Sequence, residues 1–479
     1  MFDVDGKVTT QIGGAEDVAL AVAIQPDGKI VCAGYSSGVS TIAFVVRYNA
    51  DGSLDTSFNG TGKVTENFAG GLTLATSIGV QSDGKILVGG YTSATSGRDF
   101  FLLRYNSNGT LDPSFDGDGK ITTDFASRDE ADALFIQPLD GKIVLTGETN
   151  NNTPNRTFAA LARYNTDGSP DNSFGTGGKV ISHEGAAYSV LIQPDGQLVT
   201  GGWGCAAATC TSNLDYTFAR YNANGSLDAT FGTGGKATVA VSNGRDEARA
   251  IALQTDGKIV AVGANLSSAV GDPIAVVRLN ANGTPDTSFG TNGIVQNLPV
   301  AVENAFGLGI QANGKIVASG RIYPTSTDSD FALLRLNTNG TPDTTFSGDG
   351  FATTSFANNL DGIIDLAIQS DGKIVAVGFA ENQIGDIDAA VARYLSPVTV
   401  SGRVLTPDGR GLVNAKVSIT GLNSAKRTVL TSSFGFYSFD NVLTGDTYTV
   451  AVKSKLYLFT SQTFLINDDF TAVNFTGQE

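Results

Sequence analysis

The sequence predicts an all-β fold: a seven-bladed β-propeller of four-stranded blades, followed by a small C-terminal β-sandwich. The main observation is a unit of about 57 residues that recurs seven times between residues 1 and 395. Within each unit, short apolar segments alternate with turns rich in Gly, Asn and Asp, and no segment shows a helical period over ten residues. Regularly spaced short strands of this kind indicate repeated antiparallel sheets.

Each copy of the unit carries the same turn motif, Gln-x-(Asp/Asn)-Gly-(Lys/Gln)-(Ile/Leu), with one inserted residue, Leu139, in the third copy. The motif begins at Gln25, Gln81, Gln137, Gln193, Gln254, Gln311 and Gln369. An apolar run that ends in Arg follows the motif, and in six copies an Asp, a Phe and a Gly-rich turn come next. Because the compound pattern keeps its order, the copies are expected to be one structural unit repeated.

The first unit shows why four strands are expected in each copy. Residues 19–25 are apolar and small, and residues 26–28 are Pro-Asp-Gly, a tight-turn sequence in which Gly takes a positive φ. Residues 29–35, 44–48 and 62–65 supply three further strand patterns. Four-stranded sheets repeated seven times suit a β-propeller, because radial closure protects the sheet edges. A linear solenoid would need distinct capping repeats, and none is visible in the sequence.

The repeats resemble those of the bacterial delta-60 repeat family of β-propellers. The resemblance rests on motifs such as Phe331-Ala332-Leu333-Leu334-Arg335-Leu336-Asn337 and Gln369-Ser370-Asp371-Gly372-Lys373-Ile374-Val375. The unit is also similar to an NHL-type blade, in which the last strand is outermost. This similarity implies that residues 6–12 form the outer strand of the last blade and close the ring. Seven complete units also result if counting starts at Gly6, so the sequence leaves the phase open.

A second domain is expected over residues 398–479, after a break in the repeat at 395–397. Its short alternating strands are typical of a β-sandwich. The motifs Ser401-Gly402-Arg403-Val404 and Gly435-Phe436-Tyr437-Ser438-Phe439 resemble a carboxypeptidase regulatory-like domain of prealbumin-type fold. This resemblance implies a spacer or adhesion module without peptidase chemistry, in a bacterial protein that is extracellular or displayed at the cell surface.

The composition argues against several classes of function. A formal net charge of −16 disfavours binding to nucleic acid and anionic lipid, and no apolar run is long enough for a transmembrane helix. The single His rules out multi-His metal centres. The chain shows no signal peptide, and repeat sequence begins directly after Met1, so we expect the start to be trimmed.

The three Cys residues are expected to be structural. Cys205 and Cys210 lie in a segment of small residues and lack zinc-ligand spacing. A disulfide that closes this segment as a loop, and would imply an oxidising compartment, is weighed evenly against two free thiols. Cys32 lies within an apolar strand pattern and is expected to be a buried free thiol.

Residues that recur in every copy are also expected to be structural. The Arg that ends the third strand is expected to pair with the Asp that follows it, as Arg104 with Asp112. The recurring Phe, such as Phe115, is expected to fill the space between blades, with burial contributing about 2 kcal/mol each.

Function is expected on the loops that differ between copies. In a four-stranded antiparallel blade, the first-to-second and third-to-fourth turns share one face, and these turns are nearly identical in all copies. The second-to-third loops on the opposite face vary, and we expect them to form the ligand face, with neutral drift of solvent loops as the alternative. The ligand-binding residues predicted there are Trp203, Tyr216, Arg98, Arg321 and Tyr323, and core packing is the alternative for Trp203.

Two aspartate pairs resemble fragments of calcium loops, because paired carboxylates suit a hard cation. They are Asp3 with Asp5 and Asp116 with Asp118. Neutral residues stand at the equivalent positions of other copies, such as 175–178, so ordinary turns are favoured and no cofactor other than this weakly indicated calcium is expected.

These observations favour a non-enzymatic scaffold whose propeller binds a protein or glycan partner and whose sandwich spaces or tethers it. The alternative is a hydrolase or lyase that uses acidic residues around the central channel, with or without calcium. Such an enzyme predicts a cluster of acids at the channel mouth that breaks the repeat pattern. The sequence alone reveals no such cluster, so no catalytic residue is predicted.

Overall fold

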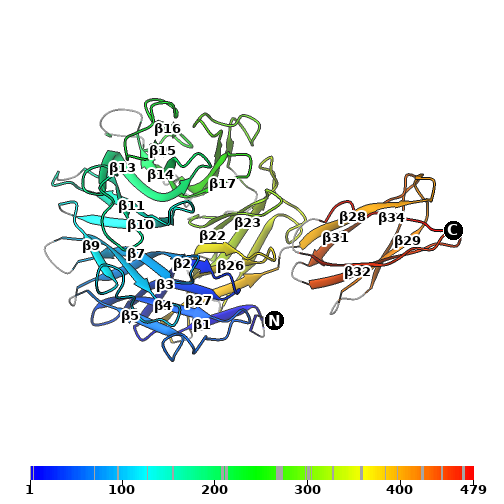
Figure 1. The fold of residues 1–479 in the computed structure, drawn as a ribbon, viewed down its shortest axis with the longest axis horizontal. Helices are drawn as coiled ribbons and strands as arrows, with labels where there is room; N and C mark the ends of the chain where they lie inside the picture. Colours follow the sequence, from blue (N-terminus) through cyan, green and yellow to red (C-terminus); the bar gives the residue numbers. More distant parts are fainter. Residues whose placement is uncertain are drawn as a thin grey trace.

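The fold is taken from a computed structural model that describes residues 2–479 except 4, 69–70, 94–96, 127, 154–155, 206–209, 211–213, 266–272, 297, 299–301, 304, 326–327, 357–359, 383, 396, 422–425, 444–445 and 467–469. Every regular element within these residues is a β-strand, as the sequence predicts. The described residues contain no helix long and apolar enough to span a membrane. Figure 1 shows the propeller and, beside it, the C-terminal sandwich.

The propeller has seven blades of four antiparallel strands each. Blade 1 comprises β2 (Glu16–Ile24), β3 (Ile30–Ser37), β4 (Thr41–Tyr48) and β5 (Lys63–Glu66). Blade 2 comprises β6 (Thr73–Val80), β7 (Ile86–Thr92), β8 (Asp99–Tyr105) and β9 (Lys120–Thr123). Blade 3 begins with β10 (Asp129–Ile136), β11 (Ile143–Thr149) and β12 (Phe158–Tyr164). The long strand β13 (Lys179–Ile192) is the outer strand of blade 3 and continues as the inner strand of blade 4.

The remaining blades repeat this order. Blade 4 continues with β14 (Leu198–Gly204), β15 (Asp215–Tyr221) and β16 (Lys236–Val239). Blade 5 comprises β17 (Asp246–Leu253), β18 (Ile259–Asn265), β19 (Ile274–Leu279) and β20 (Ile294–Val295). Blade 6 comprises β21 (Leu308–Ile310), β22 (Ile316–Thr325), β23 (Asp328–Leu336) and β24 (Phe351–Thr354). Blade 7 comprises β25 (Asp361–Ile368), β26 (Ile374–Glu381), β27 (Ile387–Tyr394) and the N-terminal strand β1 (Lys7–Thr10).

The N-terminal strand closes the ring. β1 pairs antiparallel with β27, from Lys7 opposite Ala392 to Thr10 opposite Ala389. The ring of Phe2 lies 4.7 Å from the Arg393 guanidinium and is 3 % exposed, so Phe2 fills the place of the recurring Phe in the last blade. The phase implied by the NHL-type resemblance is thereby confirmed.

Recurring ion pairs hold the third and fourth strands of the blades together. The Arg Nε donates to the Asp Oδ2 over 2.6–2.8 Å in six blades: Arg47–Asp55, Arg104–Asp112, Arg163–Asp171, Arg220–Asp228, Arg278–Asp286 and Arg335–Asp343. The Arg104 guanidinium also donates to the carbonyl of Thr166 in the next blade at 2.5 Å. Each pair is therefore part of the ring's structure, as predicted, and not of a binding site.

The recurring Phe residues seal the contacts between blades. Phe115 is fully buried in a cluster that joins Leu102 of blade 2 to Leu145 of blade 3. Its ring centroid lies 4.3 Å from the Arg104 guanidinium, so the ion pair and the apolar contact support each other.

The C-terminal domain is a sandwich of two sheets around its own core. One sheet contains β31 (Phe436–Leu443), β28 (Pro397–Leu405) and β34 (Phe475–Thr476), in that order. The other contains β30 (Arg427–Leu430), β29 (Lys416–Gly421), β32 (Asp446–Lys453) and β33 (Gln462–Ile466). Val400, Val417 and Phe439 are among the residues buried between the sheets.

Candidate functional site

The two aromatic residues predicted at the longest variable loop lie in different environments. Trp203, near the end of β14, is half-buried and donates its Nε1–H to the Tyr188 hydroxyl at 2.9 Å. Tyr216 is the second residue of β15, is 0 % exposed, and donates its hydroxyl to the carbonyl of Ala275 at 3.2 Å. Tyr216 is therefore a core residue, contrary to the prediction, because the strand already begins at Asp215.

The other three predicted ligand contacts lie at or near the surface. Arg98 pairs with the Glu130 carboxylate, and its guanidinium lies 5.3 Å from the centre of the Tyr91 ring. Arg321 is half-buried on β22, and Tyr323, two residues on, is 43 % exposed. Parts of the variable loops, including 94–96, 206–209, 211–213 and 326–327, lie outside the described residues. A role in ligand binding stays a prediction for Arg98, Arg321 and Tyr323.

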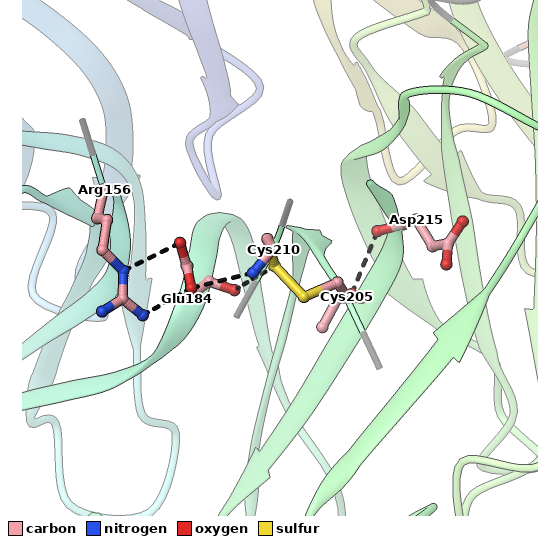
Figure 2. The surroundings of a disulfide bond; sticks show 6 residues. Arg156, Glu184, Cys205, Cys210 and Asp215 are labelled. Atoms are coloured by element: carbon pink, nitrogen blue, oxygen red, sulfur yellow. Dashed lines mark hydrogen bonds and ion pairs between the residues drawn. A yellow bond between two sulfur atoms is a disulfide. The ribbon is translucent and has the colours of Figure 1, made fainter. Parts of the chain in front are cut away.

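A disulfide anchors the longest variable loop (Figure 2). Cys205 and Cys210 are joined, with their Cα atoms 5.6 Å apart, so the disulfide interpretation is confirmed. The Cys210 N–H donates to Glu184 Oε2 at 3.1 Å, and the same oxygen accepts from Arg156 Nη2 at 2.7 Å. Because Glu184 belongs to β13, the loop is fixed to the strand that joins blades 3 and 4. Cys32 is a buried free thiol, as predicted.

The aspartates first considered for calcium lie in turns. Asp3 and Asp116 are equivalent residues with left-handed φ values of 43° and 50°. The N–H of each donates to a carbonyl in the next blade, at 2.7 Å and 2.9 Å. Asp5 forms an ion pair with Lys7, and Asp118 accepts the N–H of the first residue of β9. Among the described residues, the acids close enough to share one ion are instead Asp99, Asp124 and Asp129.

The innermost strand of each blade carries a different side chain at one recurring position. In six of the seven blades the register between the first and second strands shifts at a β-bulge, such as the one between Ala131 and Ala133. The bulge residue always stands five positions before the recurring Gln, and Phe306 holds this position in blade 6. We name these residues the inner ring: Leu20, Thr76, Asp132, Tyr188, Arg249, Phe306 and Ile364.

A recurring Gly in the second strand makes room for each bulge. A Cβ atom on Gly90 would lie 2.0 Å from the carbonyl oxygen of Leu74, and one on Gly202 would lie 2.0 Å from that of Ala186. Such distances are far below van der Waals contact, so only Gly fits. The scaffold therefore keeps the bulge constant while its side chain varies.

All seven inner-ring residues line one cavity of about 320 Å³. Because they come from all seven blades, the cavity lies on the propeller axis. Thr76, Asp132, Tyr188 and Arg249 form a polar half, and Phe306, Ile364 and Leu20 form a mainly apolar half that also contains Asp365. The wall is thus chemically asymmetric, although the backbone around it is nearly sevenfold.

Asp132 is the most unusual group in the cavity wall. Its Oδ2 is buried and has no hydrogen-bond partner within the described residues. Burial raises the pKa of Asp132 well above its ordinary value, and Glu148 and Glu130 raise it further, while Arg249 opposes them. The carboxyl is therefore harder to ionise than an ordinary aspartate.

Five residues form a closed circuit of contacts beside the cavity. The circuit consists of Trp203, Tyr188, Arg249, Glu247 and Arg245. The Tyr188 hydroxyl accepts from the indole, and the Arg249 guanidinium lies 4.6 Å from the centre of the Tyr188 ring. Fully buried Glu247 pairs with Arg249 and Arg245, and the Arg245 guanidinium lies 5.6 Å from the Trp203 ring. The circuit fixes Tyr188 and Arg249 and pairs two guanidinium groups with one carboxylate.

A second set of variable residues follows the recurring Gly of the second strands. We name it the mouth ring: Tyr35, Tyr91, Glu148, Trp203, Ala264, Arg321 and Phe379. The Arg321 guanidinium lies 5.5 Å from the centre of the Phe379 ring, and Arg98 lies beside Tyr91. The structure thus places Trp203 and Arg321 in this ring and Arg98 against it.

Sequence reasoning missed the inner ring, including Asp132, Tyr188 and Arg249. The signal was available, because the position five residues before the recurring Gln is the one that changes most in chemistry along the first strand. It was overlooked because a bulge breaks the two-residue alternation by which inward-facing residues are recognised. The acids around the axis, Glu130, Asp132, Glu148 and Glu247, do break the repeat pattern.

The fold, with the inner ring around its axial cavity, defines a β-propeller protein with an appended sandwich module. Residues 25–58, 81–115, 139–174, 193–231, 254–289, 311–346 and 369–396 match the DUF5122 β-propeller, a domain of unknown function. Residues 399–477 match a carboxypeptidase regulatory-like domain. The chain belongs to the DUF5122 β-propeller family, in agreement with the resemblance seen in its repeats.

Solved structures with similar strand arrangements share little sequence with the chain. A protein of unknown function from Dyadobacter fermentans is 12 % identical over 81 % of this chain and 97 % of its own, with a TM-score of 0.40. The polysaccharide lyase Uly1 is 12 % identical over 78 % and 89 %, with a TM-score of 0.42. An ulvan lyase of family PL25 is 11 % identical over 80 % and 95 %, with a TM-score of 0.44. Likeness at this level says nothing about activity, and no curated protein sequence matches the chain.

Proposed function

We propose that this protein is a non-enzymatic binding scaffold, secreted or displayed at the cell surface, whose propeller binds a glycan or protein partner at the face with the variable loops. One observation supports this proposal above all. The blades share their ion pairs and their Phe contacts, yet differ at the inner ring and the mouth ring. A purely structural ring has no need of seven different side chains around its axis, whereas a binding site does.

The chemistry of the cavity favours a sugar as the bound group. Asp132 and Tyr188 offer hydrogen-bonding groups, and Arg249 is already paired with Glu247. Phe306, Ile364 and Leu20 face them with apolar surface. A sugar presents hydroxyl groups on its edge and C–H groups on its faces, which matches such a divided wall. The sandwich, as a carboxypeptidase regulatory-like domain, would space or tether the propeller.

Trp203 makes this proposal directly testable, because it is the only Trp in the chain and contacts a cavity residue. We expect a glycan array and a protein-partner screen to yield a ligand that changes Trp fluorescence with saturation. Tyr188→Phe should weaken the binding at least tenfold, because it removes one hydroxyl and keeps the ring. Trp203→Ala and a variant that lacks residues 205–210 should bind more weakly in the same screens.

The matched control is Tyr48→Phe, which removes a hydroxyl that donates to Thr10 in the core, away from the cavity. It should leave affinity unchanged. Equal binding by wild type, Tyr188→Phe and Trp203→Ala would contradict the assignment of the ligand to this face.

Asp132 favours a second candidate function, a hydrolase or lyase acting on a polysaccharide. A carboxyl whose pKa is raised by burial is suited to donate a proton to a leaving group. If the cavity is catalytic, incubation with acidic and neutral polysaccharides releases shorter products, and Asp132→Asn abolishes the release without loss of binding. Binding without any product in wild type would leave the scaffold function as the better account.

A further inference from the structure

A second polar cluster lies away from the axis, where neighbouring blades meet. At three such junctions, an Asp within the first three residues of the third strand of one blade approaches an Asp that opens the first strand of the next. The pairs are Asp99 with Asp129, Asp215 with Asp246 and Asp330 with Asp361. The junction between blades 2 and 3 has a third acid, Asp124, directly after β9, and the junction between blades 6 and 7 has Asp328 at the start of β23.

Carboxylate oxygens of Asp99, Asp124 and Asp129 all lie within 4.8 Å of one another. Asp129 is fully buried, and its Oδ2 accepts the N–H of Phe125 at 2.5 Å. Its Oδ1 is also buried but accepts no well-formed hydrogen bond within the described residues. The Phe125 ring packs on Phe100 at 5.0 Å, which holds the loop that carries Asp124 against the strands that carry the other two acids.

One ammonium group lies beside this cluster, because Lys179 Nζ donates to the backbone carbonyl of Asp124 at 2.9 Å. Arg98 and Arg128, the nearest arginines in sequence, both pair with Glu130. Among the described residues, no Lys or Arg forms an ion pair with Asp99, Asp124 or Asp129. Burial, with a smaller contribution from Asp124 and Asp99, raises the pKa of Asp129 to about 6, although hydrogen bonds with Thr149 and Phe125 lower it. Asp129 is buried and Asp99 is half-buried, so holding their carboxylates beside that of exposed Asp124 is costly, and a bound cation would offset this repulsion.

The junction between blades 4 and 5 shows how the same position is satisfied without a cation. There Asp246 accepts the N–H groups of Val241 and Ser242 at 2.9 Å and 2.7 Å, and the Ser242 hydroxyl at 2.7 Å. Ala240 stands where the blade 2–3 junction has Asp124. One junction thus satisfies its buried Asp from within the chain, and the other adds a carboxylate instead of a hydroxyl.

We propose that Asp99, Asp124 and Asp129 bind a Ca²⁺ ion that ties blade 2 to blade 3. Three carboxylates form a hard, all-oxygen donor set, which Ca²⁺ accepts in flexible geometry and completes with water or carbonyl oxygens. Two oxygens that each lie about 2.4 Å from one ion can be at most about 4.8 Å apart, as these are. Mg²⁺ demands stricter octahedral geometry and retains its water, so it fits this set less well.

The proposal is tested on the full chain after treatment with a chelator and removal of the chelator. Calorimetric titration with CaCl₂ should show one ion per chain, and Ca²⁺ should raise the unfolding temperature by several degrees. Asp124→Asn and Asp99→Asn should each weaken Ca²⁺ binding at least about tenfold. Asp215→Asn, at the junction satisfied by Ser242, is the matched control and should bind Ca²⁺ as wild type does.

Measurements without Ca²⁺ separate an ion site from a structural role. Asp124 is exposed, so Asp124→Asn should fold normally and melt at or above the wild-type temperature in chelator, because it relieves repulsion. The proposal is overturned if wild type shows neither binding heat nor stabilisation with CaCl₂, or if Asp124→Asn and Asp99→Asn bind Ca²⁺ like wild type. Neither result would bear on ligand binding at the axial cavity.

Discussion

Asp365 stands where the other six blades have Ala, Ser or Gly, one position after the inner ring. Its side chain lines the cavity and accepts the N–H of Val22 in blade 1 at 3.0 Å and that of Leu366 at 2.8 Å. Burial raises the pKa of Asp365 to about 7, against the effect of these two hydrogen bonds. A single residue thus gives the closing blade a group that titrates near neutrality.

This pKa predicts how stability depends on pH. In the unfolded chain Asp365 titrates near 4, so between about pH 4 and pH 7 folding takes up a proton. Its contribution is complete below pH 4 and is lost as the pH rises to 7, by up to ~1.4 kcal/mol per pH unit. Asp365→Asn should therefore gain stability relative to wild type from pH 4.5 to pH 8 in urea unfolding. A constant difference across that range would contradict the prediction.

The recurring ion pairs predict a larger effect of substitution. Asp112→Asn leaves the Arg104 guanidinium buried without its carboxylate and should lower the free energy of unfolding by about 3 kcal/mol. Asp83→Asn in the same blade removes an exposed carboxylate 3.6 Å from Lys85 and should cost less than about 1 kcal/mol. Denaturant unfolding of both variants measures the contrast, and equal losses would show that the buried pair has no special role.

At the scale of strands, the bulge found in six innermost strands explains why Gly recurs at one position of the second strand. Gly90→Ala would bring a Cβ atom against the Leu74 carbonyl, so we expect it to lower the free energy of unfolding by about 2 kcal/mol or more. Gly38→Ala, where the nearest atom is 3.9 Å from the added Cβ, is the control and should be nearly neutral. Thermal unfolding compares the two, and an equal effect would mean that the bulge adapts.

The strands themselves were largely predictable, because turn sequences such as Pro26-Asp27-Gly28 mark their ends in every copy. The candidate site was not, for two physical reasons. A bulge shifts which residues face the axis, so Asp132 could be found only by comparing all seven copies. In the long loop before β15, no pattern shows where the strand begins, and Tyr216 was assigned to the loop although it lies in the core.

At the scale of the whole molecule, closure by β1 predicts that the N-terminus is essential to the fold. Removing residues 1–11 would expose the edge of β27 and empty the place of Phe2. We expect the truncated chain to lose at least about 3 kcal/mol and to aggregate on heating, because an unpaired edge strand recruits other chains. Thermal unfolding with light scattering tests this, and an unchanged midpoint would show that three strands suffice for blade 7.

The pairing of Lys7 with Ala392 also sets an order of events during synthesis. β1 precedes the first six blades in the sequence and its partner β27 follows them, so β1 can pair only after those blades have been made. Until then, residues 7–10 are unpaired and exposed to solvent. Their sequence, Lys-Val-Thr-Thr, carries one large apolar side chain and three polar ones. Because a closing strand of this composition exposes little apolar surface, it has little tendency to pack against the wrong blade.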